Sequence, residues 1–166
     1  MDCKFLTVEG LFNYRVAGVF VHEGRLLAMK DDGIDHYYLP GGRVKMHETT
    51  AEALCREVGE ELYVGARPLR PLWLNEAFFE NAGKRVHELA LYWLAELEWE
   101  KLPSLAGSFD LTDTDGVTHH FTWLEPEQVR AAHIYPLVLK DQFPALPQSL
   151  TLVSDIQQRE SPPTGT

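Results

Sequence analysis

The stretch that decides the fold covers residues 41–65 and reads GGRVKMHETTAEALCREVGEELYVG. Within it, Thr49 and Glu52 form a capping-box pattern, because the hydroxyl of the first and the carboxylate of the second can bond the free amide groups at a helix start. The apolar residues that follow recur at helical spacing and make one stripe: Ala51, Leu54, Val58 and Leu62. The pattern therefore predicts a helix that begins at Thr49 and buries one face.

Three glutamates of the same helix lie close together on another face. On an ideal helix, Glu57, Glu60 and Glu61 fall within an arc of about 100°, away from the apolar stripe. Carboxylates at this spacing repel one another unless a cation lies between them. In proteins, Mg²⁺ takes its oxygen ligands from a few carboxylates and from substrate phosphates. The three glutamates therefore indicate either a divalent metal site or a solvated acidic face.

The flanking sequence predicts an α/β fold with a mixed β-sheet. Alternating apolar residues on both sides of a Glu-Gly turn predict a hairpin over residues 15–29. Further strands are expected over 37–39, 69–79, 86–97 and 118–124, and helices over 126–132 and around 137–143. Residues 98–116 resemble an irregular connection. Because no linker or repeat divides the chain, we expect a single domain over residues 1–153 and a mobile tail over 154–166.

Charge and composition limit the classes of function. The chain has 166 residues, a net charge of −10, 45% hydrophobic and 24% charged residues, which is typical of globular rather than disordered proteins. The acidic excess disfavours long nucleic acids, whose phosphates bind Lys and Arg. Two cysteines make no disulfide framework and favour a reducing compartment. The N-terminus lacks a signal-peptide core and no apolar run could span a membrane, so we expect a cytoplasmic protein with no membrane partner.

Residues 42–64 resemble the Nudix box, Gly-x5-Glu-x7-Arg-Glu-U-x-Glu-Glu-x-Gly-U, in which U is aliphatic. The matching positions are Gly42, Glu48, Arg56, Glu57, Val58, Glu60, Glu61 and Val64. The preceding Leu-Pro-Gly-Gly also resembles the family's entry into the box, and the resemblance extends over approximately residues 14–143. One position departs, because Tyr63 replaces the box glycine. That glycine would suit a left-handed helix cap, so we expect Gly65 to end the helix instead and the metal face to be unaffected.

The resemblance implies both a fold and an activity. The fold would be a Nudix-type α/β/α sandwich with a mixed β-sheet. The activity would be Mg²⁺- or Mn²⁺-dependent hydrolysis of the pyrophosphate in a nucleoside diphosphate derivative, by water attack at phosphorus. Its partner would be a small nucleotide: an ADP-ribose-like sugar nucleotide, or a nucleoside triphosphate as in MutT-like members. Many proteins of the family dimerise, so a homodimer is one expected assembly.

Two other functions compete with this hypothesis. A Nudix-fold nucleotide sensor without turnover would usually carry a degraded box, whereas every charged position of the box is present here. A capped-RNA hydrolase would need a basic surface along which RNA could bind, and the Lys and Arg residues are scattered. The enzyme acting on small nucleotides is therefore the favoured hypothesis.

The resemblance also implies roles for the box residues. The implied metal ligands are Glu57, Glu60, Glu61 and the backbone carbonyl of Gly41. One of the glutamates would double as the general base, and the implied catalytic set is Glu57, Glu60, Arg56 and Glu48. Arg56 would orient Glu57, while Glu48 would pair with Arg56 and brace the loop against the helix. Arg56 could also form a surface pair with Glu52, one helical turn away, worth only about 0.3 kcal/mol.

Three further side chains are candidates for contacts with the substrate. Glu88 shares one strand face with Ala90 and Tyr92, and is either an additional ligand or base, or a solvated residue at the rim. Arg15 either contacts a phosphate or is an exposed arginine at a strand start, the commoner situation. Tyr38 either stacks on a base or packs in the core. The sequence leaves these alternatives open.

Overall fold

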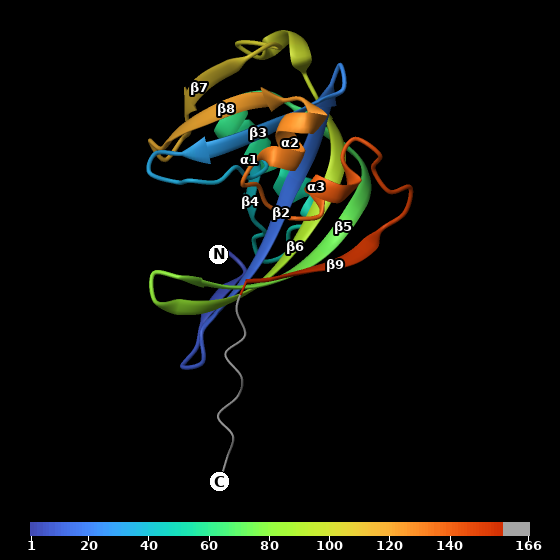
Figure 1. Cartoon of the computed structure of the whole chain (residues 1–166). Helices are drawn as coiled ribbons and strands as arrows, with labels where there is room; N and C mark the ends of the chain where they lie inside the picture. The colour runs from blue at the N-terminus through green and yellow to red at the C-terminus, as the bar shows by residue number, and fades with distance from the viewer. Residues whose placement is uncertain (158–166) are drawn as a thin grey trace.

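A mixed β-sheet forms the centre of the fold in the computed structural model, which describes residues 1–157 (Figure 1). Its strands within that range are β1 (Lys4–Leu6), β2 (Leu11–His22), β3 (Arg25–Asp31), β4 (Gly41–Arg43), β5 (Ala66–Asn81), β6 (Lys84–Leu97), β7 (Ser108–Thr112), β8 (Thr118–Leu124) and β9 (Thr151–Ile156). The strand order is β7-β8-β3-β2-β6-β5-β9, with β1 and β4 also paired to β2. β2 runs parallel to β6, and β5 to β9, whereas the hairpin partners are antiparallel.

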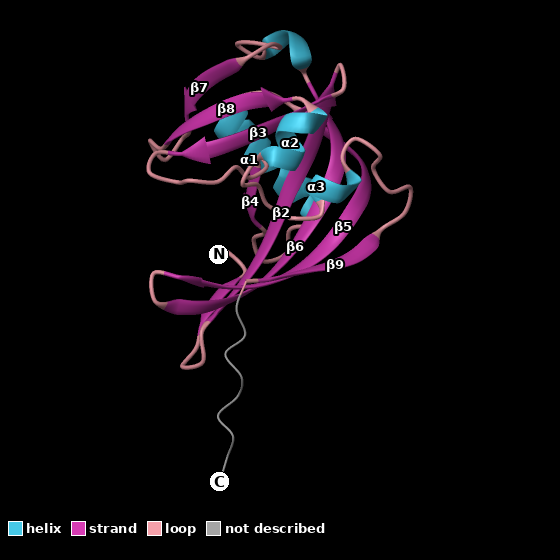
Figure 2. Cartoon of the chain, viewed as in Figure 1, coloured by secondary structure: helices cyan, strands magenta, loops and turns pink. Residues whose placement is uncertain are grey.

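Helices cover both faces of this sheet (Figure 2). They are α1 (Thr50–Leu62), α2 (Pro126–Ala131) and α3 (Leu139–Gln142), with a short 3₁₀ helix, η1 (Trp99–Lys101). The alternation of β2 explains the two layers, because Val16 and Phe20 pack in the core with α1, whereas Ala17 and Val19 pack in the core with α2 and α3. The expected α/β/α sandwich with a mixed sheet is therefore confirmed.

The start of α1 is as predicted, and its end is not. Thr49 is the N-cap: its hydroxyl accepts from the Glu52 amide at 3.3 Å, and the Glu52 carboxylate accepts from the Thr49 amide at 2.8 Å. The expectation that Gly65 ends the helix is wrong, since Tyr63 itself takes the left-handed conformation with φ 57°. The Tyr63 hydroxyl donates to the Thr112 carbonyl at 2.5 Å, a contact that a glycine could not make. This bond helps to offset the roughly 1 kcal/mol cost of the conformation.

Three other expectations are corrected at the sheet edges. Tyr37 and Tyr38 form isolated bridges rather than a strand over 37–39, and the supposedly irregular segment 98–116 contains η1 and the edge strand β7. The predicted tail is also wrong at its start, because residues 154–156 belong to β9, paired with β5 over Trp73–Phe78. The remainder of that tail, residues 158–166, lies outside the described residues. None of the helices in the described chain combines the length and hydrophobicity needed to cross a bilayer.

Candidate active site

Two glycines bring the loop before α1 against the sheet and the helix. Gly41 has φ 144°, and a Cβ there would lie 2.3 Å from the Val16 carbonyl oxygen. At Gly42, a Cβ would lie 2.2 Å from the Glu57 carboxylate oxygen Oε2. Both glycines belong to β4, which pairs with β2. Any side chain here would therefore separate the loop from the sheet or displace a carboxylate of α1.

Gly41→Ala is expected to lower the free energy of unfolding by about 2 kcal/mol, because the new Cβ meets backbone and the conformation is strained. The matched control is Gly59→Ala inside α1, where the new Cβ would have no described atom within 4 Å apart from its chain neighbours and the backbone of α1 itself. That change is expected to raise the free energy of unfolding by up to about 1 kcal/mol. Urea denaturation measures both, and equal effects would contradict the close approach at Gly41.

Arg56 connects the loop to the glutamates of α1. Its guanidinium binds Glu48 through two hydrogen bonds, of 2.7 and 2.9 Å, and donates to Glu57 at 2.7 Å, to Glu60 at 3.3 Å and to the Arg43 carbonyl at 2.9 Å. The bonds from Arg56 lower the pKa of Glu48 to about 2. The expected bracing role is thus consistent with the contacts. The alternative pair with Glu52 is not formed, because the Glu52 carboxylate caps Thr49.

Three of the four glutamates of α1, Glu57, Glu60 and Glu61, each use one oxygen within the protein. Glu57 and Glu60 accept from Arg56, and Glu61 accepts from the Gly41 amide at 2.9 Å. The second oxygen of each has no hydrogen-bond partner among the residues that the structure describes. Burial raises the pKa of Glu61 to about 8 despite the Gly41 bond, and the nearby Glu57 adds to the rise. Carboxylate oxygens without a protein partner are donors of the kind that a hard divalent cation prefers.

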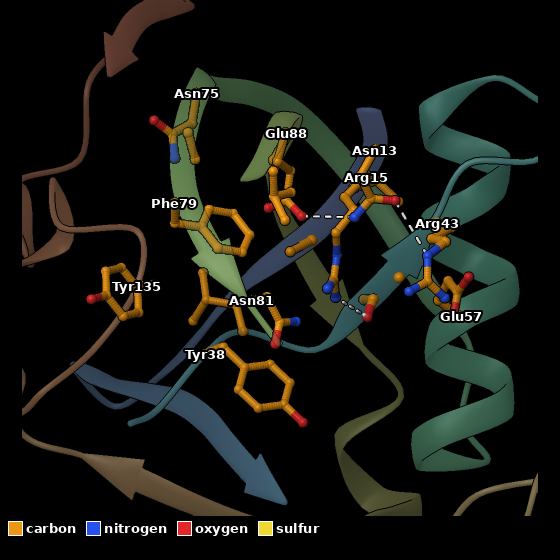
Figure 3. Close-up of a pocket in the computed structure, with 18 of the residues that line it drawn as sticks. Asn13, Arg15, Tyr38, Arg43, Glu57, Asn75, Phe79, Asn81, Glu88 and Tyr135 are labelled. Carbon is orange, nitrogen blue, oxygen red and sulfur yellow. Dashed lines mark hydrogen bonds between the residues drawn. The ribbon is translucent and has the colours of Figure 1, made fainter. Parts of the chain in front are cut away.

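A cleft of about 990 Å³ runs from these glutamates across the sheet (Figure 3). Its floor includes Arg15 and Glu88, from the parallel pair β2 and β6. Arg15 donates to the Gly41 carbonyl at 3.3 Å, and Asn13 donates to Glu88 at 2.8 Å. Burial opposes the charge of Arg15, but the neighbouring Glu88 helps to raise its pKa above the ordinary value. Arg15 is half-buried inside the cleft, so the exposed strand-end position expected from the sequence is wrong.

Tyr38 lines the same cleft from the loop between β3 and β4. Its side chain is half-buried, and burial together with a hydrogen bond to Asp31 raises the pKa of the phenol. Glu88, Ala90 and Tyr92 all line the cleft, as the strand alternation predicted. The structure therefore brings all three candidate substrate residues to one cavity with the box glutamates, although their roles remain predictions.

The sequence did not single out a polar pair at the other end of the cleft. Asn75 of β5 is 2% exposed and donates to Asp155 of β9 at 3.2 Å. Asp155 also accepts from the Leu137 amide at 3.1 Å. The Asn75 side-chain oxygen Oδ1 is buried and has no hydrogen-bond partner among residues 1–157, and Asn75 is one of the residues that line the cleft. Since buried carbonyl oxygens are rarely left unpaired, this atom is an acceptor for a donor that the described residues do not supply.

Sequence and structure comparisons place the chain in a family. The family model described as NUDIX domain matches residues 13–144, so the chain belongs to the Nudix family and is a Nudix hydrolase. Nudix hydrolases generally use divalent metals. A search of curated proteins finds no match.

Solved structures share the fold at low identity. A NUDIX hydrolase from Nitrosomonas europaea has a TM-score of 0.58 at 14% identity, covering 87% of this chain and 79% of that one. A UDP-X diphosphatase has a TM-score of 0.55 at 17% identity, covering 84% and 66%. An ADP-ribose pyrophosphatase from Streptococcus suis 89-1591 has a TM-score of 0.53 at 15% identity, covering 86% and 98%. At these identities the similarity shows the fold alone.

Proposed function

We propose that this Nudix hydrolase cleaves the pyrophosphate linkage of a small nucleoside diphosphate derivative, with Mg²⁺ or Mn²⁺ as its cofactor. The observation that carries the proposal is that Glu57, Glu60 and Glu61 share one wall of a cleft of about 990 Å³. That volume is at the upper end of the range for small-molecule sites. The substrate would be an ADP-ribose-like sugar nucleotide or a nucleoside triphosphate. Two of the structural neighbours, an ADP-ribose pyrophosphatase and a UDP-X diphosphatase, are named for substrates of the first class.

The cation would be held by Glu57, Glu60, Glu61 and the Gly41 carbonyl, which face the cleft from α1 and β4. When bound, it would neutralise phosphate charge and lower the pKa of a water molecule. It would also offset the net charge of −10, which otherwise repels a polyphosphate. Long nucleic acids remain disfavoured by that charge.

The side chains around the cation have separate tasks in this proposal. Glu57 or Glu60 accepts the proton of the attacking water, while Arg56 and Glu48 hold these carboxylates in place. The water oxygen bonds to phosphorus and the bridging P–O bond breaks, so a sugar nucleotide gives a nucleoside monophosphate and a sugar phosphate. Arg15 binds a phosphate oxygen, because its guanidinium lies in the floor of the cleft. Glu88, which lines the same cleft, is the candidate for an additional ligand or base.

Residues away from the glutamates offer contacts for the base and the sugar of a nucleotide. Tyr38 offers a ring for stacking, and the unpaired Asn75 oxygen offers an acceptor for a base or sugar donor. A homodimer is compatible with this arrangement but is not required by it. The proposed site therefore needs residues of one chain only.

The test is a metal-dependent activity screen of the full chain. Nucleoside diphosphate sugars, nucleoside triphosphates and dinucleoside polyphosphates are each incubated with Mg²⁺, with Mn²⁺, and with a chelator. We expect release of a nucleoside monophosphate from one class, and loss of at least about 99% of it with the chelator. Tight nucleotide binding without hydrolysis across the panel would overturn the proposal in favour of a sensor.

Asn75→Leu is expected to raise KM for the best substrate of that screen by about 10-fold, with kcat within twofold. The reason is that the substitution removes a buried acceptor across the cleft from Glu57 (Figure 3) while keeping a side chain with the same number of heavy atoms. Steady-state kinetics measures the change, and circular dichroism checks the fold. An unchanged KM would show that the Asn75 oxygen does not contact the substrate.

A further inference from the structure

A second group of metal-ligating side chains lies at the rim of the cleft. Asp35 and His36 come from the loop between β3 and β4, and His133 follows α2. One ligand atom from each lies within 4.8 Å of the others, and no other such group of three occurs among residues 1–157. The ring nitrogens point to one carboxylate: His36 Nδ1 is 3.1 Å from Asp35 Oδ1, and His133 Nδ1 is 3.6 Å from Asp35 Oδ2.

The backbone holds the two segments of this cluster together. The Tyr37 amide donates to the His133 carbonyl at 2.8 Å, and the Tyr135 amide donates to the Tyr37 carbonyl at 3.0 Å. A parallel bridge between Tyr37 and Ile134 results. The residues next to both histidines are therefore fixed, although the histidines are nearly one hundred positions apart in the sequence.

Tyr135 orients both imidazole rings. Its hydroxyl lies 3.2 Å from His133 Nε2, and its ring meets the His36 ring edge-on at a centroid distance of 5.1 Å. Because Nε2 of His133 contacts the Tyr135 hydroxyl, the other ring nitrogen, Nδ1, faces Asp35. Metal-ligating histidines generally have a second partner of this kind on the other ring nitrogen.

We propose that Asp35, His36 and His133 bind a divalent transition metal ion of the Zn²⁺ class, separately from the glutamates of α1. Two imidazole nitrogens and a carboxylate oxygen, with a fourth position open to water, are a common Zn²⁺ donor set, whereas Mg²⁺ disfavours imidazole. Ligand atoms about 2.0–2.1 Å from a tetrahedral ion lie about 3.3 Å apart, whereas the three donor atoms here lie within 4.8 Å of one another, with His36 Nδ1 3.1 Å from Asp35 Oδ1 and His133 Nδ1 3.6 Å from Asp35 Oδ2. Side-chain rotations that bring these atoms closer together would enclose an ion.

The cluster lines the same cleft as the glutamates of the Nudix box but shares no residue with them. Its three residues and Tyr135 line the same cavity as Glu57, and Figure 3 shows Tyr135 across that cavity from Glu57. An ion bound here places positive charge at the wall opposite the glutamates, with its open position available to a ligand oxygen. The site is defined by protein ligands alone, so its binding can be measured without a nucleotide.

The experiment is a Co²⁺ titration of the full chain in excess Mg²⁺, followed by visible absorption. We expect one equivalent of Co²⁺ to give the bands of a four- or five-coordinate site, and one equivalent of Zn²⁺ to remove them. His36→Ala and His133→Ala should each weaken Co²⁺ binding by about 100-fold, and Tyr135→Phe by about 10-fold. The matched control is His87→Ala, an exposed histidine of β6 outside the cluster, which should leave binding unchanged.

A substitution in the Nudix box distinguishes this metal site from the proposed catalytic metal site. Glu60→Gln should keep the Co²⁺ bands, whatever happens to nucleotide hydrolysis. His36→Gln serves as a milder variant if alanine disturbs the loop, and circular dichroism verifies folding in every case. Absence of the bands in the wild type, their persistence in both histidine variants, or their loss in Glu60→Gln would each overturn the assignment.

Discussion

Glu60→Gln is expected to lower kcat for nucleotide hydrolysis by about 1000-fold while leaving the fold intact. Glu60 accepts from Arg56 through Oε2 at 3.3 Å, so one carboxylate oxygen is committed to the protein. A glutamine has only one oxygen. If that oxygen stays on Arg56, an NH₂ group replaces the oxygen that would bind the cation, and the negative charge and basicity are lost as well.

The measurement is kcat in Mg²⁺ with the best substrate, together with Mn²⁺ binding followed by electron paramagnetic resonance. Glu127→Gln is the matched control, because Glu127 is 79% exposed on α2, pairs with Arg130, and lies outside the cleft. That control should retain full activity and full Mn²⁺ binding. If Glu60→Gln retained more than about a tenth of the wild-type kcat, neither a ligand role nor a base role for Glu60 could stand.

The parts of the site that the sequence predicted are local. The capping box lies within four residues, and the glutamates of α1 are one helical turn apart, so helical geometry alone determines their arrangement. The same holds for the strand alternation that brings Glu88 and Tyr92 to one face. The sequence did not predict that Tyr63 ends α1 in the left-handed conformation. That conformation is supported by a hydrogen bond to Thr112, which lies on a different element.

The parts that the sequence missed depend on contacts between distant segments. Asn75 meets Asp155 only because β9 pairs in parallel with β5, and a short edge strand near the end of the chain has little apolar pattern. Arg15 is half-buried because β2 lies beside β6, again a parallel pairing without a local signal. The side chains around a ligand are thus set by strand order, which residue spacing does not determine.

Arg56→Ala is expected to lower the free energy of unfolding by about 3 kcal/mol, and the melting temperature by about 6–12 °C. Arg56 makes five hydrogen bonds, four of them to carboxylates, so its loss leaves Glu48 and Glu57 without their cation. Urea denaturation at pH 7 measures the effect. The matched control is Arg67→Ala, whose ion pair with Glu96 is exposed and should contribute less than about 1 kcal/mol.

The pH dependence identifies the origin of that loss. The pKa of Glu48 falls from 4.5 to about 2 in the folded protein, so its pairing with Arg56 stabilises the fold above pH 4.5 and is lost as the pH falls toward 2. The difference between Arg56→Ala and the wild type should therefore be smaller at pH 3 than at pH 7. Arg56→Lys, which keeps the charge without the planar fork, should lie between the two proteins at pH 7. An equal difference at both pH values would mean that Arg56 stabilises the fold by packing, and not by its charge.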